Sequence, residues 1–326
     1  MLKEIVAASL LVSIAARADE PLVRTIDIPA DLASMTSNPE LSGVVWSASL
    51  GRYLVVTDDS GLRAKGTNHL PMLLSLSQDG SLEKTPIPIR GVKAINDPES
   101  ICAGPEGTYF LVTSHSPNRD NRTKPERRQL MQLKEEKGGL RVVAGMDLTK
   151  VTGAKSLLAL AGLPEEGRLD IEAITFRDDA LYLGFKSPLT PAGEAAILRI
   201  ANPLAVLRAG KLHAGSAQRF LVVPLCVDVR GDRVCQGISD MTFLPDGSLV
   251  LSANAPKGGP KDHGGALWHL PSPVGKTPPV LLNRFPKLKP EGVTLSANGR
   301  SLVVVFDTDT ESPKWTEIPL PASKKR

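Results

Sequence analysis

Short apolar runs separated by polar turns dominate the hydropathy pattern of this chain. Val, Ile, Leu and Tyr fill the runs, and turn sequences punctuate them at 104–107 (GPEG), 245–247 (PDG) and 298–299 (NG). Such turns between β-forming runs are typical of hairpins. Helical periodicity is rare: we expect one helical insertion at 148–163 and two turns of helix at 203–209. The pattern therefore predicts an all-β protein.

One hairpin phrase occurs five times along the chain. Its copies read LSGVVWSASLGRYLVVTDDS, PESICAGPEGTYFLVTSHS, IEAITFRDDALYLGFKSP, ISDMTFLPDGSLVLSANAP and KPEGVTLSANGRSLVVVFDTD. If the copies are aligned at Ser42, Glu99, Glu172, Asp240 and Glu291, their spacings are 57, 73, 68 and 51 residues. A recurrence of this length is the signature of radially repeated four-stranded sheets. The sequence therefore predicts a β-propeller.

Two further short strands can be drawn after most of the hairpins. We expect them at 72–76 and 82–86, 129–133 and 141–144, 195–200 and 219–223, and 266–270 and 279–282. The last copy has one such strand, at 315–318, and we expect 22–28 near the N-terminus to supply the missing strand and close the ring. Closure removes the exposed sheet edges. Five blades are favoured, and six are the alternative. A β-sandwich or a two-domain all-β protein ranks lower because neither predicts five similar hairpins.

The first residues have the pattern of a secretory signal peptide. Lys3 precedes an apolar run at 5–15, and Ala16 and Ala18 flank Arg17. This order predicts cleavage after Ala18. We expect a signal peptide at 1–18, a single propeller domain at 19–326, and a periplasmic or secreted protein with no membrane association after cleavage.

Composition and cysteine content narrow the functional classes. Aromatic residues make up 4% of the chain and the formal net charge is +4, which does not favour a nucleic-acid partner. In an oxidising compartment Cys226 and Cys235, on either side of an expected turn at 230–232, are favoured to form a hairpin disulfide over free thiols. Cys102 falls in an apolar run and is expected to be a buried core residue.

Polar residues gather where each hairpin begins and ends. The two ends of an antiparallel hairpin lie side by side, so a channel lined by the first strands would bring these residues to one mouth. Carboxylate and amide oxygens suit a hard cation, and Ca²⁺ is the first choice in an exported protein. The expected metal ligands are Glu99, Asp240, Asn254, Glu291 and Asp58. The alternative is that these acids only accept hydrogen bonds between blades, and the residues leave both interpretations open.

Basic residues are frequent in the loops that follow the second strands. Such groups attract phosphate or carboxylate, although solvated loop charge is the simpler interpretation of any one of them. The expected substrate-binding residues are Arg127, Arg128, Lys186, Lys257 and His263. His115, directly after a strand, is the expected general acid or base, with Glu99 and Glu172 as catalytic carboxylates. A surface histidine that only forms a hydrogen bond is the alternative.

Several of these segments resemble known families. DPES, TSHS, RTKPERRQL, DIEAIT, LYLGFKSPL and AAILRI resemble an uncharacterised bacterial β-propeller family of unknown function. The SGV and PEGV strand starts are similar to the wider group of esterase-like phytases and calcium-dependent lactonases. That second resemblance implies a metal in the central channel held by Glu99, Glu172, Asp240, Asn254 and Glu291. Ser42 and Lys186 depart from the pattern, and Lys186 would take the place of a metal if it paired with Glu172.

Two functions follow from the sequence. The first is a metal-dependent hydrolase of the phosphoesterase or lactonase type that acts on a small anionic molecule. The alternative is a non-catalytic propeller that binds a ligand or a protein partner on the same face. A channel sealed by ion pairs of Lys186 with Glu172 and Glu291 would favour the second.

Overall fold

The structure, a computed structural model, describes residues 21–33, 39–57, 70–118, 120–255, 264–274, 277–308 and 311–320. Strands dominate these residues, and each of the five sequence repeats contributes an antiparallel hairpin. The hairpins are β2–β3 (Leu41–Ser47, Arg52–Thr57), β6–β7 (Pro98–Ala103, Thr108–Thr113), β11–β12 (Asp170–Arg177, Ala180–Ser187), β18–β19 (Gly237–Phe243, Leu249–Asn254) and β22–β23 (Lys289–Leu295, Ser301–Asp307).

Two outer strands extend each hairpin into a four-stranded unit. These strands are β4 (Met72–Leu76) and β5 (Ile87–Arg90), β8 (Leu130–Glu136) and β9 (Gly139–Met146), β13 (Ala195–Ala201) and β15 (Ala217–Val223), β20 (Gly265–Leu270) and β21 (Val280–Phe285), and β24 (Lys314–Pro319) and β1 (Arg24–Thr25). β5 and β9 pair in parallel at their outer edges, which joins the first two units into one eight-stranded sheet.

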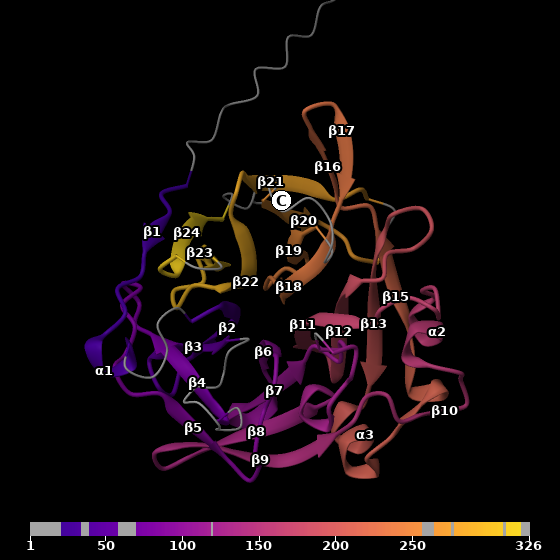
Figure 1. Cartoon of the computed structure of the whole chain (residues 1–326), viewed down its shortest axis with the longest axis horizontal. Helices are drawn as coiled ribbons and strands as arrows, with labels where there is room; N and C mark the ends of the chain where they lie inside the picture. Colours follow the sequence, from indigo (N-terminus) through magenta and orange to yellow (C-terminus); the bar gives the residue numbers. More distant parts are fainter. Residues whose placement is uncertain are drawn as a thin grey trace, which may run out of the picture.

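The sheets are arranged around a common centre, which is the arrangement of a β-propeller (Figure 1). The first strand of each repeat is innermost. β2 contacts β6, β6 contacts β11, β11 contacts β18, β18 contacts β22, and β22 returns to β2. The inner strands therefore form a closed cycle.

The two ends of the described chain meet in one sheet. Arg24 and Thr25 of β1 pair with Trp315 and Lys314 of β24, and the hydroxyl of Thr316 donates a hydrogen bond to the carbonyl of Leu22. The N-terminal segment thus completes the last repeat, as the strand count predicts. This pairing covers an edge that β24 would otherwise expose.

Apolar side chains form a core between each pair of neighbouring sheets. One cluster, for example, joins Phe110 of β7 to Leu183 and Leu198 of the next sheet, and another joins Leu41 and Val55 of the first sheet to Val305 of the last. Three further clusters fill the remaining junctions. Neighbouring sheets therefore cover both faces of each inner hairpin. This explains why the sequences of these strands are nearly continuous apolar runs.

The helices partly follow the sequence prediction. α3 (Pro203–Ala209) spans the expected two turns, with Pro203 at its start and Gly210 in the left-handed conformation at its end. The helical expectation for 148–163 was wrong over most of its length, because only α2 (Leu157–Ala161) forms there. Ser156 caps α2, and the preceding β10 (Val151–Thr152) pairs with β14 (Leu212–His213). α1 (Ala30–Ala33) is a single turn.

One predicted strand is displaced. The expectation of a strand at 82–86 was wrong: only Leu82 makes a bridge there, to Leu76, and β5 begins at Ile87. Pro86 and Pro88 flank this start, and proline lacks the N–H needed inside a ladder.

A hairpin of β16 (Cys226–Val229) and β17 (Asp232–Cys235) projects from the ring between β15 and β18 (Figure 1). Cys226 and Cys235 lie opposite each other in its register and form a disulfide. Cys102 is a buried free thiol. No helix within the described ranges has both the length and the apolar character needed to cross a membrane.

A β-bulge interrupts the start of every inner strand. The register skips Glu99 in β6, Glu172 in β11, Ser239 in β18 and Glu291 in β22, and the shift in β2 falls at 42–43. A bulged residue is turned away from regular pairing. The structural equivalent of the three glutamates is therefore Ser239 and not Asp240, so the sequence alignment of the fourth repeat was wrong by one residue.

Asp240 occupies the position after the bulge, where the inner strands converge. The equivalent residues are small: Gly43, Ser100, Ala173 and Gly292. A Cβ on Gly43 would lie 2.6 Å from the Cα of Ser100, and one on Gly292 would lie 2.9 Å from the carbonyl oxygen of Ser42. Close packing at the axis therefore restricts these positions, and Asp240 alone carries a longer side chain into it.

The carboxylate of Asp240 joins the inner strands. It accepts hydrogen bonds from the hydroxyl of Ser100 (2.7 Å) and the backbone N–H of Val293 (2.9 Å), and from the N–H groups of Met241 and Val44. The Ser100 hydroxyl also accepts from the N–H of Ile174 at 3.2 Å. Asp240 is 1% exposed. Its hydrogen bonds join four of the repeats, and the Ser100 hydroxyl extends the connection to the third repeat.

Replacing Asp240 by alanine is expected to lower the free energy of unfolding by about 3 kcal/mol or more, because several buried donors lose their acceptor. Equilibrium urea unfolding followed by tryptophan fluorescence measures this. Asp228→Ala, at an exposed position of β16, is the matched control and is expected to change stability by less than about 0.5 kcal/mol. Equal losses in the two variants would contradict the structural role of Asp240.

Candidate functional site

Three bulged glutamates meet at one mouth of the ring. Glu99, Glu172 and Glu291 stand at the starts of β6, β11 and β22, and each is 7% exposed. The bulges turn these side chains away from the ladder and toward the mouth. The structure therefore brings together three of the acids that the repeat pattern singled out.

Lys186, near the end of β12, joins two of these acids. Its ammonium nitrogen lies 2.5 Å from Oε2 of Glu172 and 3.3 Å from Oε1 of Glu291. Burial lowers the pKa of Lys186, but the two carboxylates outweigh it and hold the pKa well above its ordinary value. Lys186 is therefore charged and connects the third repeat to the fifth.

The pKa of Glu172 is raised despite its ion pair with Lys186. Burial raises the pKa of its carboxyl, the ammonium of Lys186 lowers it, and the carboxylates of Glu291 and Asp170 raise it further. The net effect is a pKa well above the ordinary value. Burial thus favours the protonated form of Glu172, and a further positive charge beside it would favour the ionised form.

Asp170 completes a compact acidic cluster. Glu99, Asp170 and Glu172 are all buried, and one carboxylate oxygen from each lies within 4.8 Å of the others. Sequence reasoning missed Asp170. The sequence shows a second acid two residues before Glu172, but the register of β11 shifts on both sides of Ile171, so regular alternation along the strand does not predict the direction of its side chain.

Two other expected metal ligands have different surroundings. Asp240 is bound by the hydrogen bonds at the axis, as described above. The side-chain amide of Asn254 donates to the hydroxyl of Ser239 (2.8 Å) and to the carbonyl of Pro290 (3.1 Å), so it links neighbouring sheets. Asp240 is not among the acids of the cluster. Asp58 lies outside the described residues.

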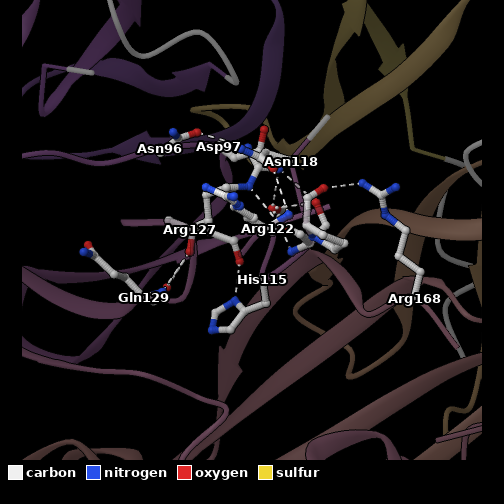
Figure 2. A network of polar contacts seen from close by, with 12 residues as sticks. Asn96, Asp97, His115, Asn118, Arg122, Arg127, Gln129 and Arg168 are labelled. Carbon is white, nitrogen blue, oxygen red and sulfur yellow. Dashed lines mark hydrogen bonds and ion pairs between the residues drawn. The ribbon is translucent and has the colours of Figure 1, made fainter. Parts of the chain in front are cut away.

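Arg127 holds the loop between β7 and β8 in place (Figure 2). Its guanidinium donates to the carbonyl of Ser116 (2.9 Å), to Oδ1 of Asn96 (3.0 Å) and to the hydroxyl of Ser114 (3.2 Å), and it pairs with Asp97. Arg127 is 8% exposed. These contacts occupy its donors, so its geometry is that of a loop clamp rather than the substrate contact expected from the sequence.

His115 adopts a constrained conformation on this loop. Its φ is +58°, in the left-handed region that few non-glycine residues adopt. Nδ1 lies 2.7 Å from the carbonyl oxygen of Thr113, and a carbonyl only accepts, so Nδ1 carries the proton. Burial lowers the pKa of His115 to about 4. At neutral pH its Nε2 therefore offers a lone pair, which suits a base or an acceptor and not an acid.

His115 and Arg128 line a pocket of about 460 Å³ beside the loop clamp. Thr149 and the segment Glu166 to Leu169 form its other wall. Leu169 directly precedes Asp170, so the pocket adjoins the acidic cluster along the chain. Arg128 was an expected substrate contact, and the other two, Lys257 and His263, lie outside the described residues.

A second pocket, of about 340 Å³, lies toward the other ends of the inner strands. Trp46, Phe176 and Phe243 contribute to its wall, together with Thr175 and Thr242. No charged side chain is among the described residues that line it. Lys186 and the acids of the mouth are not among its lining residues.

No protein-family model matches the chain, and no curated protein matches it in sequence. The expected membership of an uncharacterised family is therefore not supported.

Solved structures resemble the chain at low identity. A gluconolactonase-like protein is 13% identical over 93% of this chain and 93% of its own, with a TM-score of 0.43. A gluconolactonase from Xanthomonas campestris is 11% identical over 94% and 96%, with a TM-score of 0.46. A β-1,3-galactosidase of glycoside hydrolase family 43 is 11% identical over 87% and 90%, with a TM-score of 0.46. These TM-scores are too low to indicate the activity of this chain.

Stability is expected to depend on pH through His115. The folded pKa of about 4 lies below the ordinary value of 6.5, so the unfolded chain takes up the proton first as pH falls. The contribution of neutral His115 to the free energy of unfolding is fully present above pH 6.5 and is lost as pH falls from 6.5 to 4. Its full size is about 3 kcal/mol.

Urea unfolding at a series of pH values across this window measures the effect. His115→Asn removes the titrating group while asparagine tolerates a positive φ, so its stability is expected to fall less between pH 6.5 and 4. His213→Asn, at an exposed position of β14, is the control and should keep the wild-type slope. An unchanged slope in His115→Asn would contradict the assignment.

Proposed function

We propose that this chain is a five-bladed β-propeller that binds a divalent cation, with Ca²⁺ as the first choice, at the glutamate-bearing mouth. We further propose that it hydrolyses a small anionic ester there, of the phosphoester or lactone class. The observation that carries the proposal is the buried cluster of Glu99, Asp170 and Glu172. The cyclic contacts among the inner strands support the blade count.

The donor set fits a hard cation. All three side chains offer carboxylate oxygens, and they come from two neighbouring inner strands, β6 and β11. Ca²⁺ and Mg²⁺ prefer oxygen ligands, and Ca²⁺ accepts irregular geometry. A bound cation would supply Lewis acidity for polarising an ester oxygen.

The remaining residues of the mouth have positioning roles. Lys186 binds both Glu172 and Glu291, which restrains the Glu172 side chain beside the cluster. The inter-strand bonds of Asp240 hold β6 against β18 and β22. The carboxylates are therefore presented by a rigid scaffold, as a binding site requires.

A non-catalytic binding propeller is the second candidate, and one observation favours it. The ammonium of Lys186 lies 2.5 Å from Oε2 of Glu172, where it already provides positive charge to the acids. If Lys186 takes the place of a metal, the mouth would bind a ligand or a protein partner without catalysing hydrolysis. Cation binding distinguishes the two candidates.

Calorimetric titration with Ca²⁺ is expected to show one site with a Kd on the order of 10⁻⁴ M or tighter. Glu99→Gln and Asp170→Asn should each weaken it by at least roughly tenfold, because each removes a charged ligand. Glu106→Gln, at an exposed turn, should bind as wild type does. If only Lys186→Met binds Ca²⁺ and the wild type does not, the second candidate is correct.

Hydrolysis of aryl phosphates and small lactones is expected in millimolar Ca²⁺ and not in excess chelator. Glu99→Gln should lower kcat/KM by roughly 100-fold or more, since a ligand of the Lewis acid is lost. Glu106→Gln should retain wild-type activity. Turnover that survives chelation, or equal turnover in the two variants, would overturn the metal-dependent mechanism.

A further inference from the structure

The pocket of about 340 Å³ at the other ends of the inner strands, which we call the axial pocket, is bounded by all five repeats. The inner strands β2, β6, β11, β18 and β22 each contribute side chains to its wall. Along these strands the bulge comes first, the axis position second and the residues of this wall after it. The hydrogen bonds of Asp240 to Ser100 and Val293 therefore lie between the axial pocket and the glutamates.

The aromatic side chains of the wall are held in place by neighbouring rings. Trp46 packs edge-to-face on Tyr53 with ring centroids 4.9 Å apart, and the hydroxyl of Tyr53 accepts from the N–H of Ala297 at 3.1 Å. Phe243 packs edge-to-face on Tyr182 at 5.0 Å. Trp46, Ala297 and Phe243 all line the pocket. The wall is thus built from packed strands and turns of the fold.

Three threonine hydroxyls on this wall have no partner in the part of the chain that the structure describes. They belong to Thr175, Thr242 and Thr294, which stand two positions after the axis residues of their strands. Thr175 is 5% and Thr294 6% exposed. None of the three oxygens is among the polar atoms that are both unpartnered and closed off from solvent, so their accessible surface faces the pocket. Each hydroxyl can donate one hydrogen bond and accept another.

The surroundings of the axial pocket disfavour a charged ligand. No charged side chain is among the described lining residues, and burial raises the pKa of the Cys102 thiol on the wall, which keeps it neutral. Arg177 lies over the ring of Phe243 and is already ion-paired with Asp178. A charged molecule would lose its hydration here without gaining a counter-charge. The pocket therefore favours an uncharged ligand.

The rest of the wall is mainly apolar. Besides the aromatic rings it holds Val45, Ile101, Met241, Val293 and Leu295. A polyhydroxylated molecule would bury more polar groups than three hydroxyls can satisfy, and each one left without a partner would weaken binding. Apolar walls with a few polar groups are typical of sites for small, mostly apolar molecules.

We propose that the axial pocket binds a small uncharged molecule of the apolar-alcohol class, with an apolar body and one or a few hydroxyl groups. The hydroxyl of the ligand exchanges hydrogen bonds with the threonines, and the apolar body lies against the aromatic and aliphatic wall. This site is separate from the acidic cluster, and its binding needs no cation. Failure of Ca²⁺ binding or of hydrolysis at the mouth leaves this inference standing.

Three ligands of nearly equal shape test it in the presence of chelator: benzyl alcohol, toluene and benzylammonium. The readout is the ¹³C-methyl spectrum of methionine-labelled protein, because Met241 is 2% exposed and lines the pocket. Benzyl alcohol is expected to shift the Met241 resonance with a Kd on the order of 10⁻³ M or tighter. Benzylammonium should leave it unshifted at the same concentrations. Met146, on the outermost strand β9, is the internal control and should not move.

The triple variant Thr175→Val/Thr242→Val/Thr294→Val measures the contribution of the hydroxyls, because valine keeps the shape of threonine. The ratio of the affinities for benzyl alcohol and toluene is expected to fall by roughly fivefold or more, since at least one neutral hydrogen bond is lost. Toluene should still shift Met241, which shows that the pocket persists in the variant. Thr25→Val, at an exposed position of β1 outside the pocket, should keep the wild-type ratio.

Three results would each overturn the proposal. The first is a Met241 resonance that does not shift at any concentration of benzyl alcohol up to its solubility. The second is binding of benzylammonium at Met241 as tight as that of benzyl alcohol. The third is an affinity ratio in the triple variant equal to that of the wild type.

Discussion

A single buried carboxylate holds the inner strands together at the centre of this ring through hydrogen bonds. Asp240 accepts hydrogen bonds from its own strand and from three other repeats, and Ser100 passes the connection on to the remaining one. Inner strands that converge on an axis leave backbone N–H groups without ladder partners, and buried donors need acceptors. One aspartate among small residues satisfies several of them, so the geometry of both the mouth and the sheets depends on it.

The bulge before Asp240 separates structural acids from candidate functional acids. Glu99, Glu172 and Glu291 occupy the bulge and face the mouth, while the next position faces the axis. A shift of one residue reverses the direction of a side chain. The fourth repeat carries its acid at the second position, and for that reason Asp240 serves the scaffold although its sequence context is similar to that of the glutamates.

The repeat, the inner hairpins and the closure of the ring were predictable because they depend on local patterns of apolar runs and turns. The interaction partners of the polar side chains could not be predicted from the sequence. Arg127 clamps a loop through residues distant in sequence, and Asp170 joins Glu99 across two sheets. Such contacts depend on how sheets pack against each other, which no local periodicity records. The ion pair of Lys186 with Glu172 was predicted as an alternative to a metal, because Lys186 stands where a neutral or acidic ligand was expected.

The pairing of β1 with β24 has a consequence for the order of folding. The last sheet contains β1 together with β22, β23 and β24, so it cannot be completed until β24 has been synthesised. Contacts of such long sequence separation carry a high loop-closure cost and form slowly. Until then the first and last inner strands lack their mutual packing and present apolar faces to their surroundings. The inner strands therefore gain their full mutual packing, and with it the geometry of the mouth, only after β24 has joined the last sheet.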